Sequence, residues 1–281
     1  MSLLVAGLLM VGGLTPVEMT EKTIGPPTPI SGGTVKSIEV DGLKATLFVP
    51  QGWKRTFPAR LWCHFHSADW YVVSQYQEAE ISDPVLVCNF GQGSAVYAKP
   101  FEKPGSFSKW LRQVESEIGK IERLSFTSFS AGFGAVRKLV QDPLVLPRLD
   151  HVVLSDSFYG SLDTVSPRGK TLGEHIQAWQ GLTERAIAGK ATWVITTSQI
   201  TPETYAGTWE VARDLVDSLG GTWKNHASPP KDAESQPLLK SYEQGGLHVW
   251  CYAGETPVAH MTHARHMVDI LRQIRKASKE N

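Results

Sequence analysis

Residues 124–140, with the sequence LSFTSFSAGFGAVRKLV, place a serine between a segment of strand character and a segment of helical character. The small residues Ser128 and Gly132 flank Ser130, which favours a sharp turn that lifts the Ser130 hydroxyl off the sheet edge. The N–H of Ala131 then points to the same place, and the helix start adds a partial positive field that favours an oxyanion. The pattern predicts a nucleophilic serine. The alternative is a turn of small residues without chemistry, because such short patterns also arise by accident.

A strand, a Gly-x-Ser-x-Gly turn and a helix in this order resemble the nucleophile elbow of α/β-hydrolases. Here Ser128 takes the place of the first glycine, as another small residue. The order of the expected elements between Val35 and Lys276 is similar to the same superfamily, without singling out a family within it. The resemblance implies an α/β-hydrolase fold of the serine esterase or lipase kind. It also implies a triad in which the acid and then the histidine follow the serine along the chain.

The histidine of such a triad belongs in the segment after the last strand. Directly after the expected strand 246–253, the chain supplies His260, His263 and His266. His260 comes first and is expected in the loop before the closing helix, so it is our candidate base. His263 is the second choice, and His266 is expected on the helix surface or as a packing partner. Three histidines at this spacing could instead share a helix face and bind a metal, but no cysteine or carboxylate accompanies them, and we expect no metal site.

The candidate acid is Asp156, which follows the buried strand 149–154 at the sheet edge where ligand-facing loops emerge. In most α/β-hydrolases the acid sits one strand later, although the earlier position is also used. After that later strand, 191–196, this chain offers only Glu203. We therefore prefer Asp156 and keep Glu203 as the alternative. An ordinary turn or capping role is the competing interpretation of Asp156.

An oxyanion hole needs a second backbone N–H beside that of Ala131. The segment HFHSADW follows the expected strand 59–66 and resembles the His-Gly segment of esterases and lipases, with Ser67 in place of the glycine. The resemblance implies that the N–H of Ser67 or Ala68 completes the oxyanion hole.

Aromatic residues gather near these segments. The chain has nine tryptophans, several in expected loops, which suits the binding of a ring or a sugar, although most would equally serve as core. We expect a small-molecule or carbohydrate-linked ester as substrate. The side chains expected at the site entrance are Trp70, Tyr71, Phe129, Phe158 and Tyr159.

The elements that would position these residues alternate along the chain. Residues 35–40 and 45–49 predict an antiparallel hairpin around Asp41-Gly42. A hairpin followed by alternating strands and helices predicts an α/β fold, with a mostly parallel twisted sheet covered by helices on both faces. Besides the elbow, strands are expected at 59–66, 84–90, 149–154, 191–196 and 246–253, helices at 68–79, 108–121, 171–189, 205–219 and 263–274, and a polar loop at 222–244.

The charge and cysteine content of the chain exclude several kinds of partner and site. The chain has 281 residues, is 41% hydrophobic and carries a formal net charge of zero with no basic block. Nucleic acid and an electrostatically held membrane surface are therefore not expected as partners. The three cysteines fall within expected strands, which predicts neither a disulfide framework nor structural zinc. No cofactor is expected.

The expected domain organisation is simple. Residues 34–281 form one α/β-hydrolase-like domain, in which 159–190 would partly cap the site, and residues 21–33 form a linker. Residues 1–20 are apolar but too short to span a bilayer. They favour a cleaved signal peptide over a tether or a misassigned start, and hence a periplasmic or secreted protein over a cytoplasmic one.

The residues together predict a serine hydrolase that cleaves a carboxylic ester through an acyl-enzyme on Ser130. An amidase or peptidase would use the same triad. A hydrolase-like fold used only for binding, or a histidine-rich metal enzyme, are the alternatives from other classes.

Overall fold

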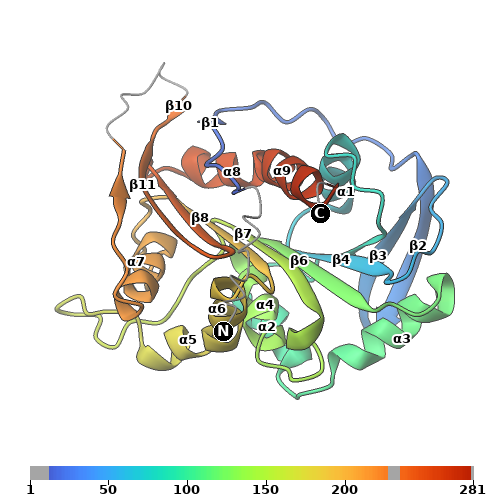
Figure 1. Ribbon diagram of the computed structural model, residues 1–281, viewed down its shortest axis with the longest axis horizontal. Helices are drawn as coiled ribbons and strands as arrows, with labels where there is room; N and C mark the ends of the chain where they lie inside the picture. The colour runs from blue at the N-terminus through green and yellow to red at the C-terminus, as the bar shows by residue number, and fades with distance from the viewer. Residues whose placement is uncertain (1–12, 227–234, 280–281) are drawn as a thin grey trace, which may run out of the picture.

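The computed structural model describes residues 13–226 and 235–279, which contain one ten-stranded sheet, one two-stranded sheet and helices on both faces of the large sheet (Figure 1). The order in the large sheet is β2-β3-β5-β4-β6-β7-β8-β12-β11-β9. From β5 to β12 neighbouring strands run parallel, and antiparallel pairs close both edges. The strands are β1 (Met19–Thr20), β2 (Gly33–Val40), β3 (Leu43–Pro50), β4 (Arg60–Phe65), β5 (Val85–Cys88), β6 (Arg123–Phe129), β7 (Leu149–Ser155), β8 (Thr192–Thr197), β9 (Lys224–Asn225), β10 (Ser235–Gln236), β11 (Leu238–Gln244) and β12 (Leu247–Tyr252).

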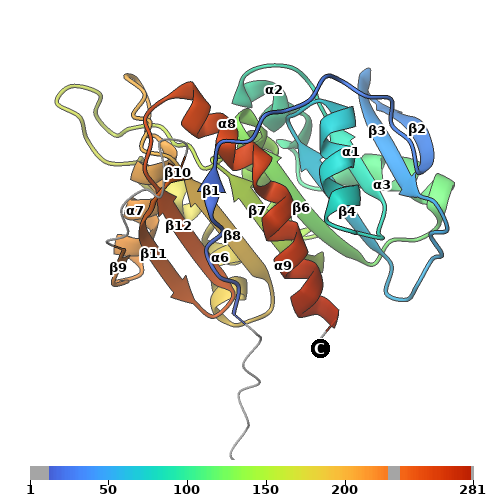
Figure 2. The same cartoon turned by 90° about the horizontal axis from the view of Figure 1, so that it is seen from above.

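Helices connect most of the parallel strands. Helices α1 and α9 cover one face of the sheet, and α3, α4, α6 and α7 cover the other (Figures 1 and 2). The helices are α1 (Asp69–Glu78), α2 (Ser94–Ala98), α3 (Phe107–Ile118), α4 (Phe133–Leu139), α5 (Gly173–Gln177), α6 (Gln180–Ile187), α7 (Thr208–Ser218), α8 (Pro257–Arg265) and α9 (Met267–Lys279), with 3-10 turns η1 (Lys99–Phe101), η2 (Ser130–Gly132) and η3 (Leu146–Arg148).

Two apolar clusters lie on the two faces of the sheet. Within β7, Val152 and Leu154 belong to one cluster and Val153 to the other, as the alternation of a strand requires. Val153 shares its cluster with Leu271 of α9, whereas Val152 shares its cluster with Val136 of α4. Because helices cover both faces, the central strands are buried on both sides. The predicted hairpin and the mostly parallel sheet with helices on both faces are confirmed.

Part of the apolar N-terminal segment packs onto the α9 face. Leu14, Val17 and Met19 are buried, and the Tyr252 hydroxyl donates to the Val17 carbonyl at 2.8 Å. Residues 1–12 of the segment that we expected to be a signal peptide lie outside the described residues. No helix in the described part of the chain has both the length and the apolar character needed to cross a membrane.

Three expectations about the elements are wrong. The segment 222–244, expected as a loop, contains strand β11, although 227–234 lie outside the described residues. The expected helix 171–189 is split into α5 and α6, because Trp179 between them is buried and stacks on Trp193 with ring centroids 5.5 Å apart. The closing helix begins at Pro257 as α8, and a second helix, α9, follows it.

Several histidines are held in their neutral form by the fold. Burial lowers the pKa of His64 to about 3, and burial lowers the pKa of His151 and of His263 to about 4. His151 stacks on Trp62, with ring centroids 5.6 Å apart, and both of its ring nitrogens are enclosed without a hydrogen-bond partner. Protonation of any of these rings would place a charge in the protein interior, where the loss of hydration outweighs the attraction of nearby groups.

These histidines predict a loss of stability in mild acid. Between a folded-state pKa of about 4 and the ordinary value of about 6.5, the unfolded chain binds more protons, so the free energy of unfolding falls as the pH falls. Each such histidine contributes a slope of up to about 1.4 kcal/mol per pH unit in this window. Denaturant unfolding between about pH 7 and pH 5 should show a shallower slope for His151→Phe than for the wild type. An unchanged slope would contradict this account of His151.

Candidate active site

Backbone strain is concentrated after three neighbouring parallel strands. His66 after β4, Ser130 after β6 and Asp156 after β7 have positive φ values of 71°, 49° and 42°. Residues other than glycine rarely adopt this backbone conformation, and each one that does lowers the stability of the fold by about 1–3 kcal/mol. The left-handed conformation turns the chain sharply at the end of each strand. All three residues lie at the carboxyl edge of the sheet, where ligands bind in open α/β sheets.

The turn at Ser130 depends on two close approaches of backbone. A methyl group on Gly132 would lie 2.1 Å from the Phe65 carbonyl oxygen, and one on Gly134 would lie 2.2 Å from the Ser94 carbonyl oxygen. Only glycine fits at either position. The elbow therefore rests directly on the end of β4, and α4 rests directly on α2.

Ser128, the residue at the position of the first glycine in the elbow pattern, has a hydrogen-bonding role. It is fully buried, and its Oγ lies 2.8 Å from Ser157 Oγ. Ser157 Oγ in turn donates to the Ser130 carbonyl at 2.8 Å. These two hydroxyls join the elbow to the residue that follows Asp156.

Asp156 is fully buried at the end of β7 and accepts four hydrogen bonds. The donors are the N–H of Ser198 at 2.9 Å, the Ser198 hydroxyl at 2.7 Å, the Thr208 hydroxyl, and His260 Nδ1 at 2.6 Å. Burial alone would raise the pKa of this carboxyl. The hydrogen bonds from His260 and Thr208 and the nearby His263 outweigh burial and lower the pKa to about 2. Asp156 is therefore an anion at neutral pH.

His260 lies in the first turn of α8, not in a loop as we expected. The Thr256 hydroxyl caps this helix by accepting from Ala259 N at 3.2 Å, and Pro257 is its first residue. The imidazole stacks on Phe129, with ring centroids 4.5 Å apart. Because Nδ1 donates to the Asp156 carboxylate, Nε2 is left as the free acceptor.

Ser130 and His260 line one cavity of about 650 Å³. Within residues 13–226 and 235–279 no hydrogen bond joins the two side chains, as is common before a substrate binds. The expected partial cap, 159–190, contributes four of the lining residues. The full lining is Gly93, Ser94, Ser130, Ala131, Phe133, Arg137, Tyr159, Gly160, Ser161, His175, Ile200, Pro202, Tyr205, Pro257 and His260.

The other histidine and acid candidates lie apart from this cavity. His263 is buried behind Asp156, and its Nδ1 lies 2.8 Å from Thr196 Oγ1. His266 Nδ1 lies 2.8 Å from the Asp269 carboxylate. His260 and His263 of α8 and His266 at its C-terminal end thus contact three different partners. Glu203 is exposed, and its carbonyl accepts from Arg168 at 3.4 Å.

The expected contact residues divide into two groups. Tyr159 lines the cavity, and Phe129 forms the surface on which His260 stacks. Phe158 is buried among tryptophans, with its ring 5.1 Å from that of Trp179.

The segment after β4 lies beside the elbow but does not line the cavity. Ser67 and Ala68 precede α1, and Trp70 and Tyr71 lie on that helix, with ring centroids 5.6 Å apart. None of the four is among the residues that line the cavity.

The sequence analysis did not identify several lining residues. Phe133 and Arg137 follow Ser130 by three and seven positions on the elbow helix, a spacing from which they could have been inferred. His175 and Tyr205 come from distant segments, and no sequence signal points to them.

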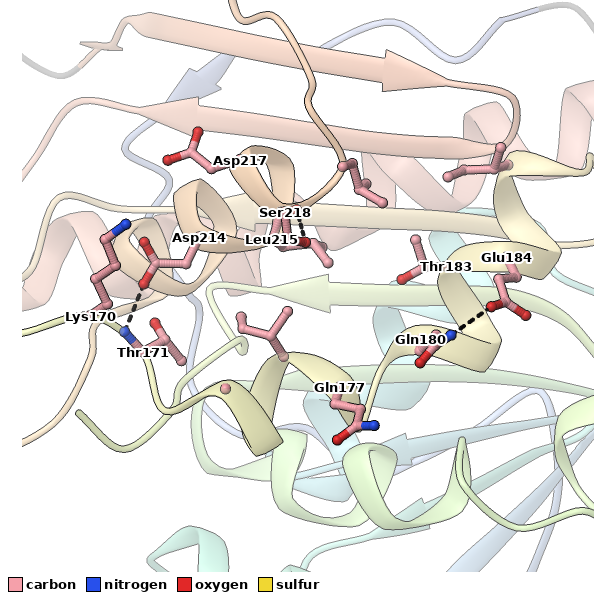
Figure 3. A pocket seen from close by; sticks show the side chains of 14 residues that line it. Lys170, Thr171, Gln177, Gln180, Thr183, Glu184, Asp214, Leu215, Asp217 and Ser218 are labelled. Atoms are coloured by element: carbon pink, nitrogen blue, oxygen red, sulfur yellow. Dashed lines mark hydrogen bonds between the residues drawn. The ribbon is translucent and has the colours of Figure 1, made fainter. Parts of the chain in front are cut away.

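A second cavity, of about 690 Å³, lies between α5, α6 and α7 (Figure 3). Its polar groups largely pair with one another: Asp214 accepts from the N–H of Thr171 at 2.7 Å, and Gln180 donates to Glu184 at 2.9 Å. None of the triad candidates lines it. The two cavities are similar in size, and Ser130 and His260 line only the one of about 650 Å³.

The fold is that of α/β-hydrolases, and the solved structures that it resembles include esterases and a serine hydrolase homologue. The feruloyl esterase module of Clostridium thermocellum is 11% identical with a TM-score of 0.50, covering 93% of this chain and 96% of that one. Carboxyl esterase 2 of Tuber melanosporum is 14% identical with a TM-score of 0.49, covering 92% and 90%. A serine hydrolase homologue from Coxiella burnetii is 12% identical with a TM-score of 0.45, covering 88% and 99%. Neither models of known protein families nor curated proteins match the sequence.

The hydroxyl pair of Ser128 and Ser157 predicts coupled effects on stability. Ser157→Ala leaves the buried Ser128 hydroxyl and the Ser130 carbonyl without this partner, and should cost about 1–3 kcal/mol. A double-mutant cycle with Ser128→Ala, measured by denaturant unfolding, should give a coupling energy of at least about 0.5 kcal/mol. Additive effects would show that the two hydroxyls act independently.

Proposed function

We propose that the protein is a serine hydrolase that cleaves a carboxylic ester through an acyl-enzyme on Ser130. One observation carries the proposal: the buried Asp156 carboxylate holds the imidazole of His260, which lines the same cavity as the strained Ser130. A serine hydroxyl is a weak nucleophile until a base accepts its proton, and the base needs a group that fixes its tautomer. The contacts of Asp156 and His260 suit these two roles.

In the proposed reaction, Ser130 Oγ attacks the acyl carbon while His260 Nε2 takes its proton. The imidazolium formed is stabilised by the Asp156 anion at Nδ1. His260 then protonates the leaving alcohol as the C–O bond breaks. The same imidazole then takes a proton from water, which attacks the acyl-enzyme. As the acid is released, His260 returns this proton to Ser130 Oγ.

The oxyanion would be bound by backbone N–H groups. Ala131 is the residue after the nucleophile and lines the cavity, which supports its N–H as the first donor. The contact between Gly132 and Phe65 holds the chain after β4 beside the elbow. This contact supports the N–H of Ser67 or Ala68 as the second donor, and it does not choose between them.

An amidase or peptidase would use the same groups, and leaving-group preference distinguishes it from an esterase. A binding protein with a hydrolase-like fold would keep the cavity but lack an activated serine. The strain at Ser130 and the charge held beside His260 favour catalysis over binding alone, because both cost free energy that a binding cavity does not need.

The first test is hydrolysis of p-nitrophenyl acetate and butyrate together with labelling by a fluorophosphonate. The wild type should turn over both esters and form an adduct on Ser130. Ser130→Ala should lose turnover and labelling while its thermal unfolding stays close to that of the wild type. If the wild type neither turns over the esters nor becomes labelled, the protein is not a serine hydrolase.

The choice of acid predicts a contrast between two carboxylates. Asp156→Asn should lower kcat by roughly 10⁴-fold, by analogy with other triads, because the amide favours the wrong imidazole tautomer. Glu203→Gln should change kcat less than about 2-fold, since Glu203 is exposed and does not line the cavity. Steady-state kinetics of the two variants side by side make the measurement. A large loss in Glu203→Gln with a small one in Asp156→Asn would exchange the two assignments.

A further inference from the structure

The charge of the catalytic cavity is one-sided. Among the lining residues in the described part of the chain there is no Asp or Glu, whereas Arg137 brings a full positive charge. Asp156 lies behind His260 and does not line the cavity. A substrate in the cavity therefore meets a cation and no exposed anion.

The guanidinium of Arg137 lies beside the ring of Phe133, on the helix that follows Ser130. Arg137 stands on α4 one turn after Phe133, and its guanidinium carbon lies 5.3 Å from the centre of that ring. The side chain thus runs back along the helix, toward the elbow. Phe133 is three residues after Ser130, and Ser130, Phe133 and Arg137 all line the same cavity.

Arg137 has an unused hydrogen-bond donor. Its Nη1 is buried and has no hydrogen-bond partner, and no carboxylate lies within ion-pair distance of Arg137 in the described residues. Burial lowers its pKa, although a guanidinium stays protonated. Because Arg137 lines the cavity and no carboxylate of the described residues pairs with it, its guanidinium is available to an anionic ligand there.

The neighbouring titratable groups do not neutralise the charge of Arg137. Glu174 acts on Arg137 only at longer range, and its own carboxylate is 72% exposed and 3.9 Å from His175 Nε2. The N–H of Ser161 donates to His175 Nδ1 at 2.8 Å. Burial, and next the charge of Arg137, lower the pKa of His175, so this ring is neutral and does not compete as a cation.

We infer that the substrate is an ester that carries a carboxylate, and that Arg137 binds this carboxylate in the cavity that Ser130 lines. The inference rests on the proposed esterase function. The planar guanidinium matches the two oxygens of a carboxylate. Tyr159 and Tyr205, with ring centroids 5.8 Å apart, line the same cavity and contact the ring or hydrocarbon part of the substrate. The carboxylate belongs to the acyl or to the alcohol part, and matched substrates distinguish the two.

The test compares two pairs of esters that differ in charge. The p-nitrophenyl monoester of adipic acid and p-nitrophenyl hexanoate place the charge on the acyl part; para-acetoxybenzoate and para-acetoxybenzamide place it on the alcohol part. The measured quantity is the ratio of kcat/KM for the charged ester to that for the neutral ester. In at least one pair the wild type should favour the charged ester by about 10-fold or more.

Arg137→Gln should lower that ratio by about 10- to 100-fold, and Arg137→Lys should lose less. Lys138→Gln is the matched control, because it removes the same charge from the adjacent residue of α4, which does not line the cavity. It should leave the ratio unchanged. Equal rates for charged and neutral esters in both pairs, or an equal loss in Arg137→Gln and Lys138→Gln, would overturn the inference.

A separate measurement distinguishes failure of the anion site from failure of the esterase function. Benzoate and benzamide are titrated by calorimetry into Ser130→Ala and into the double variant Ser130→Ala/Arg137→Gln. Binding of benzoate alone, lost in the double variant, supports the anion site even if the wild type cleaves none of the four esters. Equal binding of benzoate by both variants, or no binding by either, overturns it.

Discussion

The buried charge of Asp156 is the constraint on which the site depends. A carboxylate without exposure to water is costly unless hydrogen bonds replace its hydration. Its donors come from three separate places: Ser198 after β8, Thr208 at the start of α7, and His260 on α8. Each of these elements must be in place for the charge to be satisfied, so the fold around Asp156 and the orientation of His260 are fixed together.

The turn at Ser130 is hydrogen-bonded to the residue next to Asp156. The hydrogen bonds from Ser128 through Ser157 to the Ser130 carbonyl link the end of β6 to the end of β7, immediately beside Asp156. Positive φ at both Ser130 and Asp156 is sustained by these contacts and by the close approach at Gly132. The strained positions are therefore supported by the interactions that position Ser130 and Asp156.

The alternation of strands and helices along the chain was sufficient to predict the fold. The local pattern around Ser130 was sufficient to predict which elements meet at the candidate site. Two errors came from overlooked local signals. Thr256-Pro257 is an N-cap followed by a proline at the first helical position, a pattern that predicts the start of the helix carrying His260. Gly245-Gly246 between β11 and β12 is a two-residue hairpin turn. Such a turn predicts a strand before it, which is β11, in the segment that we expected to be a loop.

The lining of the cavity was beyond such reasoning. His175 and Tyr205 reach it from segments whose placement depends on the tertiary packing of α5 and of the loop before α7, and neither has a distinctive neighbourhood in the sequence. Trp70 and Tyr71 are the converse case. They follow a segment that adjoins the elbow, yet α1 begins at Asp69 and carries both rings away from the cavity lining.

The surroundings of Asp156 show how residues at the end of one strand support a residue at the end of the neighbouring strand. After β8, where the acid of most α/β-hydrolases would be expected, this chain has Ser198, which donates twice to Asp156. Thr196 of β8 continues the arrangement: its hydroxyl lies 3.3 Å from the Asp156 N–H and 2.8 Å from His263 Nδ1. The end of β8 thus supplies the donors that stabilise an acid one strand earlier. His263 is enclosed behind that acid and kept neutral, which leaves His260 as the histidine that faces both the carboxylate and the cavity.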